Sequence, residues 1–448
     1  MHPSSGAKKA SLSQLPLEIK QRIVHHVVMQ TEKRHTYFHK PLPLSLVDRT
    51  FYELCRPFEW NELSLPCQAI PNLEKFIHQS LPRQANHVRS ILIGVHEQPP
   101  SHSDGIFPRK QLCHILKVCT NLTKLNIRLE CAAWLDQFGN LIIDPVHRPM
   151  STLLQPISQL SNITYLTLDN LNGHRCMFDE QFLVRILRNL VHLVSLRINK
   201  VGTSFPTCDF DDQPPVQPLV SPLAIHLASL SSLKFIHFSY MHCFDSGWST
   251  IKWKGALEGI TLRKSMVSLR AVHAFCSLFE DSLVYLSLYL VPVNKTPTYE
   301  IPESDRGCVF RLPRLKRLSV YNKYIIPFLR LFRESPNITR ISIIYYSSLK
   351  GIVDLINRAD PTWINLKSLL VHGRRWQFSR DAISDLIKQG AEAGVKVECG
   401  ILKKVRQPFF EEDEFSTESD SVEESDEEIE SQDKHQDVGQ ISDCYKSP

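Results

Sequence analysis

The sequence predicts an α/β fold: a solenoid with short parallel strands on its concave face and helices on its convex face. One apolar pattern, φ-x-x-φ-x-φ, recurs ten times, and its copies begin at Val88, Leu122, Ile163, Leu193, Leu233, Leu257, Leu283, Leu315, Ile338 and Leu366. Successive copies are 23 to 41 residues apart, which fits one helix, one turn and one strand. Because a helix between two strands makes the strands run parallel, such units stack around one continuous core.

Stretches with helical spacing precede most copies of the pattern. Leu112, Ile115 and Leu116 show this spacing ahead of the second copy. Near the other end, "AISDLIKQGAEAGVKVECGIL" predicts a last helix followed by a strand through Val395 and Val397. A doubly wound α/β domain would use the same elements, but the sequence contains neither G-x-G-x-x-G nor G-x-x-x-x-G-K-[ST]. The ten copies therefore favour a solenoid.

Composition excludes several classes of protein. Of the 448 residues, 42% are hydrophobic and 22% charged, and no apolar run approaches the roughly 20 residues that a membrane helix needs. The start of the sequence lacks the apolar stretch of a secretory signal. Twelve cysteines are scattered without a C-x-x-C pair, which predicts a reducing compartment, the cytoplasm or the nucleus. Since G-x-S-x-G and H-E-x-x-H motifs are also missing, we expect no catalytic residue, metal or cofactor.

Charge divides the chain into a basic body and an acidic tail. Residues 409–448 hold fifteen Asp or Glu and two Lys, a formal charge of −13, while the rest of the chain carries +18. A segment this rich in charge cannot bury enough apolar surface to fold. We therefore expect 406–448 to be disordered, and likewise 1–11. The tail is either a simple solubiliser or a competitor for the partners of the basic body.

Residues 12–65 differ in character from the repeats, which span 70–405. Leu15, Ile19, Ile23 and Val27 recur every four residues, which predicts an apolar stripe on a short helix. A second group with helical spacing follows in "LPLSLVDRTFYELCRPFEW". Two or three short helices are too few for an independent core, so we expect an exposed apolar rim that docks onto another protein. The alternative is a cap that covers the first apolar edge of the solenoid.

The order of these residues resembles an F-box of the kind common in fungal proteins. The run L-P-x-E-I-x-x-x-I-x-x-x-V is followed by L-S-L-V-x-R-x-F, C-R-P-x-x-W and L-x-L. The repeats behind it are similar to those of the leucine-rich-repeat class of F-box proteins, although the Asn that often follows the strand is mostly missing. This resemblance implies a substrate receptor of an SCF-type ubiquitin ligase. Its F-box binds a Skp-family adaptor, and through it a cullin, and its repeats bind a protein client.

Carried over to this sequence, the resemblance assigns adaptor contacts to seven residues. They are Leu15, Pro16, Ile19, Ile23, Leu46, Val47 and Phe51. Two features depart from the usual pattern: the interval from Val27 to Leu44 is longer, and Asp48 stands where many F-boxes have Cys. A longer loop is easily accommodated. Asp48 is expected at the rim of the contact, where it would weaken adaptor binding.

The residues between the apolar positions of each strand point to the concave face, because side chains alternate along a strand. The expected client-binding residues on this face are Lys124, Arg128, Tyr165, Arg197, Arg263, Tyr285, Tyr289, Arg317, Tyr321 and Arg340. Arg and Tyr dominate interface energetics, and Arg binds carboxylate or phosphate through a bidentate fork. We therefore expect an acidic or phosphorylated client segment. The alternative is a solvated ladder in which these residues serve solubility and cross-strand packing.

Two further functions remain as alternatives to the ligase receptor. One is an interaction scaffold that has no link to ubiquitin. The other is nucleic-acid binding, which a body with a charge of +18 permits. However, the basic residues are spread along the chain without the dense stripe typical of nucleic-acid binders, so this function is disfavoured, and we expect no membrane partner.

Overall fold

The computed structural model describes residues 11–31, 42–65, 73–93, 109–129, 133–135, 141–143, 151–170, 178–202, 220–241, 243–291, 301, 303–321, 325–344, 352, 363–373 and 380–401. By its internal contacts the chain divides into two units, residues 1–404 and 405–448. The second unit and residues 1–10 lie outside the described residues. The expected disorder at both ends and the competing acidic tail therefore stay predictions.

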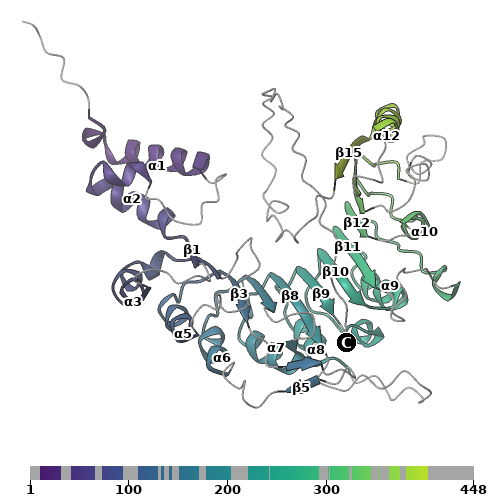
Figure 1. Cartoon of the computed structure of the whole chain (residues 1–448), viewed down its shortest axis with the longest axis horizontal. Coiled ribbons are helices and arrows are strands. Elements are labelled where there is room, and N and C mark those ends of the chain that lie inside the picture. The colour runs from purple at the N-terminus through teal and green to yellow at the C-terminus, as the bar shows by residue number, and fades with distance from the viewer. Residues whose placement is uncertain are drawn as a thin grey trace, which may run out of the picture. The chain divides into compact units, whose positions relative to one another are not determined.

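One parallel sheet runs through the described part of the first unit (Figure 1). Twelve of its strands pair in chain order: β1 (Glu62–Leu65), β2 (Ser90–Ile93), β3 (Lys124–Leu129), β6 (Tyr165–Asn170), β8 (Ser195–Gly202), β9 (Phe235–Met241), β10 (Gly259–Met266), β11 (Tyr285–Val291), β12 (Arg317–Tyr321), β13 (Arg340–Ile344), β14 (Ser368–Gly373) and β15 (Lys396–Ile401). The short β7 (Phe178–Asp179) pairs with β8, while β4 (Ala133–Leu135) and β5 (Leu141–Ile143) form a separate antiparallel pair. The predicted α/β solenoid is confirmed.

Each of the ten predicted repeats gives one strand, which begins two residues after the first apolar position. The same backbone hydrogen bonds mark these starts. The carbonyl of Thr123, for example, accepts from the N–H groups of Thr164 at 2.8 Å and Tyr165 at 3.0 Å. The same pattern holds from Asn61, which precedes β1, to Thr339, which precedes β13. In each case the carbonyl before a strand accepts from two consecutive backbone N–H groups of the next repeat. The register is therefore constant although repeat length varies, because the extra residues lie in the connections.

Helices connect most neighbouring strands and lie on one side of the sheet (Figure 1). They are α3 (Leu73–Lys75), α4 (Leu81–Gln84), α5 (Arg109–Val118), α6 (Ser151–Ser158), α7 (Glu180–Leu187), α8 (Pro222–Ala228), α9 (Leu269–Ser277), α10 (Ile325–Arg330) and α12 (Arg380–Ala393). Ser221 and Ser268 cap α8 and α9 by accepting backbone N–H bonds. One core of buried apolar residues runs between helices and strands, from Leu63 to Val397. We call the other side of the sheet the open face.

The segment before the sheet, residues 11–59, is called here the front module. Its helices α1 (Leu17–Thr31) and α2 (Arg49–Glu59) pack around a small core of Val24, Val28, Phe51 and Cys55, which is separate from the large one. The module is shorter than the predicted 12–65, because β1 pairs with β2 and its leucines belong to the large core.

Polar contacts join the front module to the first repeat. Nε of Arg56 on α2 donates to Oε1 of Gln84 on α4 at 3.0 Å, and its guanidinium also reaches the carbonyl of Arg83 at 3.4 Å. Among the described residues, no helix is long and apolar enough to cross a membrane.

Candidate partner-binding surfaces

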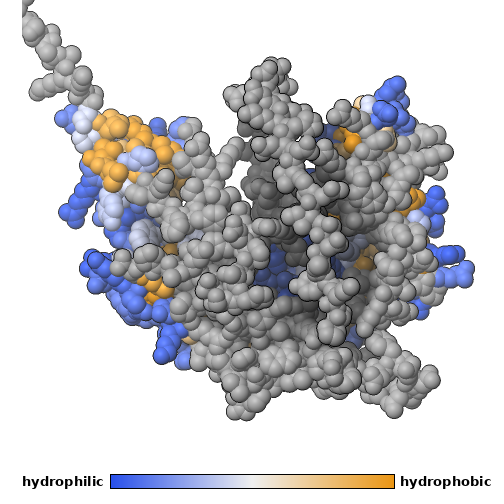
Figure 2. All heavy atoms as spheres, in the orientation of Figure 1, coloured by the Kyte–Doolittle hydropathy of each residue, from blue (hydrophilic) through white to orange (hydrophobic). Residues whose placement is uncertain are grey.

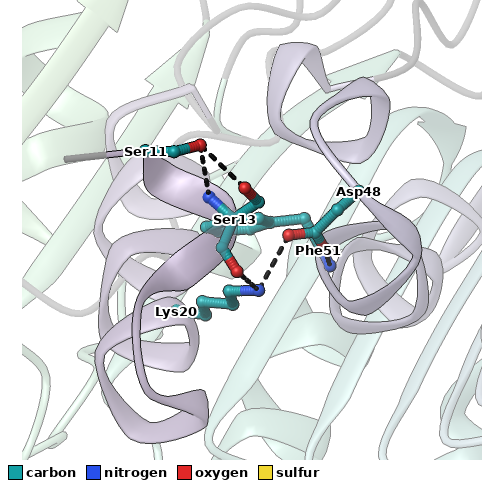
Figure 3. Close-up of polar contacts among 5 residues, drawn as sticks. All are labelled: Ser11, Ser13, Lys20, Asp48 and Phe51. Atoms are coloured by element: carbon teal, nitrogen blue, oxygen red, sulfur yellow. Dashed lines mark hydrogen bonds and ion pairs between the residues drawn. The ribbon is translucent and has the colours of Figure 1, made fainter. Parts of the chain in front are cut away.

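An ion pair between a buried lysine and a partly buried aspartate joins the helices of the front module (Figure 3). Lys20 on α1 is only 5% exposed, and its Nζ lies 2.7 Å from Oδ2 of Asp48. The same ammonium donates to the carbonyl of Ser13 at 2.9 Å and lies over the ring of Phe51, 5.2 Å from its centroid. Because a buried ammonium needs such partners, the contacts fix the turn around Ser13, α1 and the start of α2 in one arrangement.

Asp48 also caps α2. Its Oδ1 accepts from the backbone N–H of Phe51 at 2.8 Å. The hydrogen bond from Lys20, followed by that from Phe51, holds the pKa of this carboxyl below its usual value. Asp48 thus stabilises the module itself. Its side chain is 20% exposed, and its expected place at the rim of a partner contact stays a prediction.

Large apolar side chains are exposed on both segments that the ion pair joins. Figure 2 shows hydrophobic residues gathered over the part of the molecule that holds α1 and α2. The side chains are 39% to 77% exposed, and we call them the docking face: Leu12, Leu17, Ile19, Leu46 and Val47. Ile19 precedes Lys20 and Val47 precedes Asp48, so the ion pair holds the two segments of the docking face together.

The predicted adaptor residues separate into three groups. Ile19, Leu46, Val47 and Pro16 are exposed, whereas Leu15 and Ile23 are half-buried, and Ile23 packs against the small core. Phe51 has no exposed surface, because it fills the space between α1 and α2. It supports the docking face from below, so the expected direct contact of Phe51 with a partner does not fit this structure.

Strand register arranges the predicted client residues in rows across the open face. One row passes through Lys124, Tyr165, Tyr285, Arg317 and Arg340. The next row contains Arg197, and the third contains Arg128, Arg263, Tyr289 and Tyr321. Arg128 is placed by its backbone only, since its side chain lies outside the described part of the chain.

Cations and aromatic rings contact each other within these rows. Nζ of Lys124 lies 5.4 Å from the ring centroid of Tyr165, which is 46% exposed. The guanidinium of Arg263 lies 5.3 Å from the ring centroid of Tyr321, which in turn lies 6.1 Å from that of Tyr289. Such contacts order long side chains before a ligand arrives, and this lowers the entropy cost of binding.

The middle row is buried where the sequence predicted exposed residues. His237, Thr261, Ser287 and Ser319 are each less than 10% exposed, because these smaller side chains lie between the larger residues of the outer rows. Nδ1 of His237 is 2.9 Å from Oγ1 of Thr261. Burial, together with the nearby guanidinium groups on β8 and β10, lowers the pKa of His237 to about 3. Arg197 and Arg263 add positive charge to this part of the open face.

Three strained residues were missed by sequence reasoning. Lys200, Tyr240 and Lys264 have left-handed φ angles of 66°, 52° and 48°, at matching places on β8, β9 and β10. Nζ of Lys264 donates to the Tyr240 hydroxyl at 2.6 Å and lies 5.0 Å from the ring centroid. Glycine is the usual signal of such a backbone, and none stands at these positions.

Groups that could perform chemistry are sparse in the described residues. No cluster of three His, Cys, Asp or Glu side chains there could hold a metal ion. Burial raises the pKa of the Cys119 thiol to about 12 and that of Cys55 to about 11, which makes both poor nucleophiles at neutral pH.

No protein-family model and no curated protein sequence matches this chain. Among solved structures, the Rad7–Elc1 complex in yeast is similar at 13% identity and a TM-score of 0.39, over 85% of this chain and 92% of that one. The leucine-rich repeat-containing protein LegL7 from Legionella pneumophila is similar at 12% identity and a TM-score of 0.35, over 75% of this chain and 90% of that one. Both likenesses are weak, so the fold assignment rests on the strand order and register described above.

Proposed function

We propose that this protein is the substrate-recognition subunit of an SCF-type ubiquitin ligase in the cytoplasm or the nucleus. The docking face of the front module binds a Skp-family adaptor, which links the protein to a cullin. The open face of the repeats binds a protein client. In this role the chain catalyses no reaction and brings its client to the enzymes that transfer ubiquitin.

The docking face is the observation that carries the proposal. Its five apolar side chains remain exposed although the small core beneath them is complete. Exposed apolar patches of this kind mark protein interaction sites. A mere cap of the solenoid would bury its apolar residues against the first repeat, yet Leu46 is 77% exposed.

The charge of the open face favours a client with an acidic or phosphorylated segment. Arg197, Arg263, Arg317 and Arg340 lie on four strands of one continuous surface. Their positive potential favours a ligand that carries carboxylate or phosphate groups, and the neighbouring tyrosines add contact area at low entropy cost.

Adaptor binding by the full-length protein tests the docking face. Leu46→Glu places a charge in the docking face, and Ile364→Glu places one on an equally exposed residue of the repeats, since both side chains are 77% exposed. We expect the wild type and I364E to bind a purified Skp-family adaptor with equal affinity, whereas L46E binds at least about tenfold more weakly, because a buried unpaired carboxylate is costly. Circular dichroism checks that both variants fold.

The same measurement separates the alternatives. A wild-type protein that does not bind the adaptor refutes the ligase role. If that protein still binds a client, it is a scaffold without a link to ubiquitin. If it instead binds oligonucleotides with strong salt dependence, nucleic-acid binding is favoured.

Charge reversal tests the open face. A triple variant, Arg263→Glu with Arg317→Glu and Arg340→Glu, is compared with Arg185→Glu, Arg188→Glu and Arg330→Glu, which change exposed residues on the helical side. Both variants alter the net charge equally. We expect only the first to lose binding to a library of acidic and phosphorylated peptides. If both variants lost peptide binding equally, the net charge of the protein would explain the loss, and a specific site on the open face would be refuted.

A further inference from the structure

Two serines, Ser11 and Ser13, flank Leu12 of the docking face in the sequence, and Figure 3 shows both near Lys20. Ser11 and Ser13 are both exposed, and their hydroxyl oxygens are 2.7 Å apart. Leu12 between them is 47% exposed and belongs to the docking face. The carbonyl of Ser13 is held by Lys20, which ties this turn to the ion pair. A group added to the Ser11 hydroxyl therefore lies directly beside the docking face.

Ser11 has an accessible backbone. Its φ of −93° and ψ of 138° are extended, and the 3₁₀ turn that follows it, Leu12–Gln14, has only three residues. Two backbone hydrogen bonds hold the turn, from Gln14 to Ser11 at 3.0 Å and from Leu15 to Leu12 at 3.3 Å. Ser11 and Leu12 precede the contact of Lys20 with the Ser13 carbonyl, so an enzyme can bind this stretch in extended form while that contact stays in place.

The residues around Ser11 fit a kinase that selects basic substrates. In "KKASL", Lys8 and Lys9 stand three and two residues before Ser11, and the apolar Leu12 follows it. Two cations at these positions suit an enzyme with acidic pockets on that side of its catalytic centre, which is how charge patterns select kinase substrates.

The structure discriminates between sites that share this spacing. Lys316 and Arg317 precede Ser319 in the same way, but Ser319 is only 9% exposed and lies in β12, paired with strands on both sides. Its hydroxyl is out of reach in the folded protein. Thr36 also follows two basic residues and lies outside the described residues. Among the described sites of this type, Ser11 is the accessible one.

We propose that a basophilic serine/threonine kinase phosphorylates Ser11 and that the phosphate blocks the docking face. The inference rests on the proposed function, in which this face binds the adaptor. In the reaction, Oγ of Ser11 attacks the γ-phosphorus of ATP, and a new O–P bond forms as the bond to the bridging oxygen of ADP breaks. The hydroxyl proton passes to the kinase's catalytic carboxylate and then to solvent, and ADP leaves.

The phosphate weakens partner binding for an electrostatic reason. It carries a charge of about −1.5 to −2 at pH 7 and is strongly hydrated. A partner that covers Leu12 must remove part of that hydration shell. The nearest buried cation, Lys20, already donates to Asp48 and to the Ser13 carbonyl. The backbone N–H of Ser13 donates to the Ser11 oxygen at a long 3.4 Å, so the module recovers little of the cost of dehydration.

The first experiment locates the modification. Full-length protein is incubated with ATP and the catalytic subunit of cAMP-dependent protein kinase, and phosphorylated residues are identified by tandem mass spectrometry. We expect phosphate on Ser11 and none on Ser319. Replacing both Lys8 and Lys9 by Ala should slow the modification at least about tenfold, because the kinase loses both charge contacts. Ser11→Ala, Thr36→Ala and Ser13→Ala assign any remaining signal.

The second experiment measures affinity for a purified Skp-family adaptor before and after phosphorylation. We expect the phosphorylated wild type to bind at least about tenfold more weakly. Phosphatase treatment should restore binding, and kinase treatment should leave S11A unchanged. A chain that takes up no phosphate at Ser11, or one whose affinity stays within about twofold after full modification, overturns the inference.

Failure of the inference differs from failure of the proposed function. Unchanged affinity after phosphorylation leaves the adaptor role intact and removes only the switch. Absent binding by the unmodified protein refutes the adaptor role and the switch together, whereas mass spectrometry still reports separately whether Ser11 is a kinase site.

Discussion

Lys20 and Asp48 stand 28 residues apart in the sequence, yet their side chains meet at 2.7 Å inside the front module. Each follows an exposed apolar residue in the chain, Ile19 in one case and Val47 in the other. Apolar packing alone is non-directional, whereas an ion pair that also caps a helix fixes one relative orientation. The polar pair therefore sets the geometry of the apolar surface around it.

Substitution of Asp48 tests this relationship. Asp48→Asn keeps an acceptor for the N–H of Phe51 but removes the charge, while Asp48→Ala removes both contacts. We expect a several-degree fall in thermal midpoint for D48A and a smaller fall for D48N, because Asn is a good N-cap but a weak partner for a buried ammonium. Amide hydrogen exchange should show lost protection in α1 and α2, with the repeats unchanged.

The matched control lies on the same helix. Glu53 pairs with Arg56 at 2.6 Å, but its side chain is 49% exposed. Since exposed pairs contribute little, Glu53→Ala should leave the midpoint and the exchange rates of α1 unchanged. If E53A and D48A behaved alike, the ion pair with Lys20 would have no special role in the module.

The sequence predicts the strand positions of the repeats better than the packing of the front module. A strand two residues after each apolar start depends on a local pattern that every repeat carries, so each copy supports the same register. The partner of Lys20 depends on how two helices meet, and no short-range pattern encodes it. The stripe through Ile19 and Ile23 was predicted to face a partner, and the side of α1 that packs into the small core is the neighbouring one, with Val24 and Val28.

Because of His237, the free energy of unfolding of the protein depends on pH. Its pKa is about 3 in the folded protein, because it is buried beside Arg197 and Arg263, against 6.5 for an ordinary histidine. The unfolded chain therefore binds a proton that the folded chain excludes, so stability falls as pH drops from about 6.5 towards 3. His237→Gln removes this contribution. Between pH 7.5 and 5.5 the wild type should lose about 1.4 kcal/mol more than the variant in urea unfolding.

Measurements of wild type and H237Q above pH 7 serve as the control. Above pH 7 the histidine is neutral in both the folded and the unfolded chain, so wild type and H237Q should show parallel stability curves there. A constant difference from pH 7.5 down to 5.5 would mean that His237 accepts a proton in the folded state, in conflict with its burial next to two guanidinium groups.

The middle row and the three left-handed residues could not be predicted from local sequence patterns. Alternation along β9 predicts which side His237 points to, but burial depends on the size of its neighbours on β8 and β10. The left-handed residues are two lysines and a tyrosine, types that carry no local signal for that conformation. The burial of the middle row and the left-handed conformations both depend on how several strands pack together.

Backbone strain at Lys264 can be measured by comparing two substitutions. Lys264→Ala and Lys264→Gly both remove the bond to the Tyr240 hydroxyl, so they differ only in the backbone. At a left-handed φ the Cβ of alanine is unfavourable by about 1 kcal/mol, so K264G should be the more stable variant by that amount. Lys396 begins β15 without a positive φ, and there the order should reverse, with glycine less stable by about 0.5–1 kcal/mol. The same order at both positions would mean that Lys264 is unstrained and that the three aligned residues store no conformational energy.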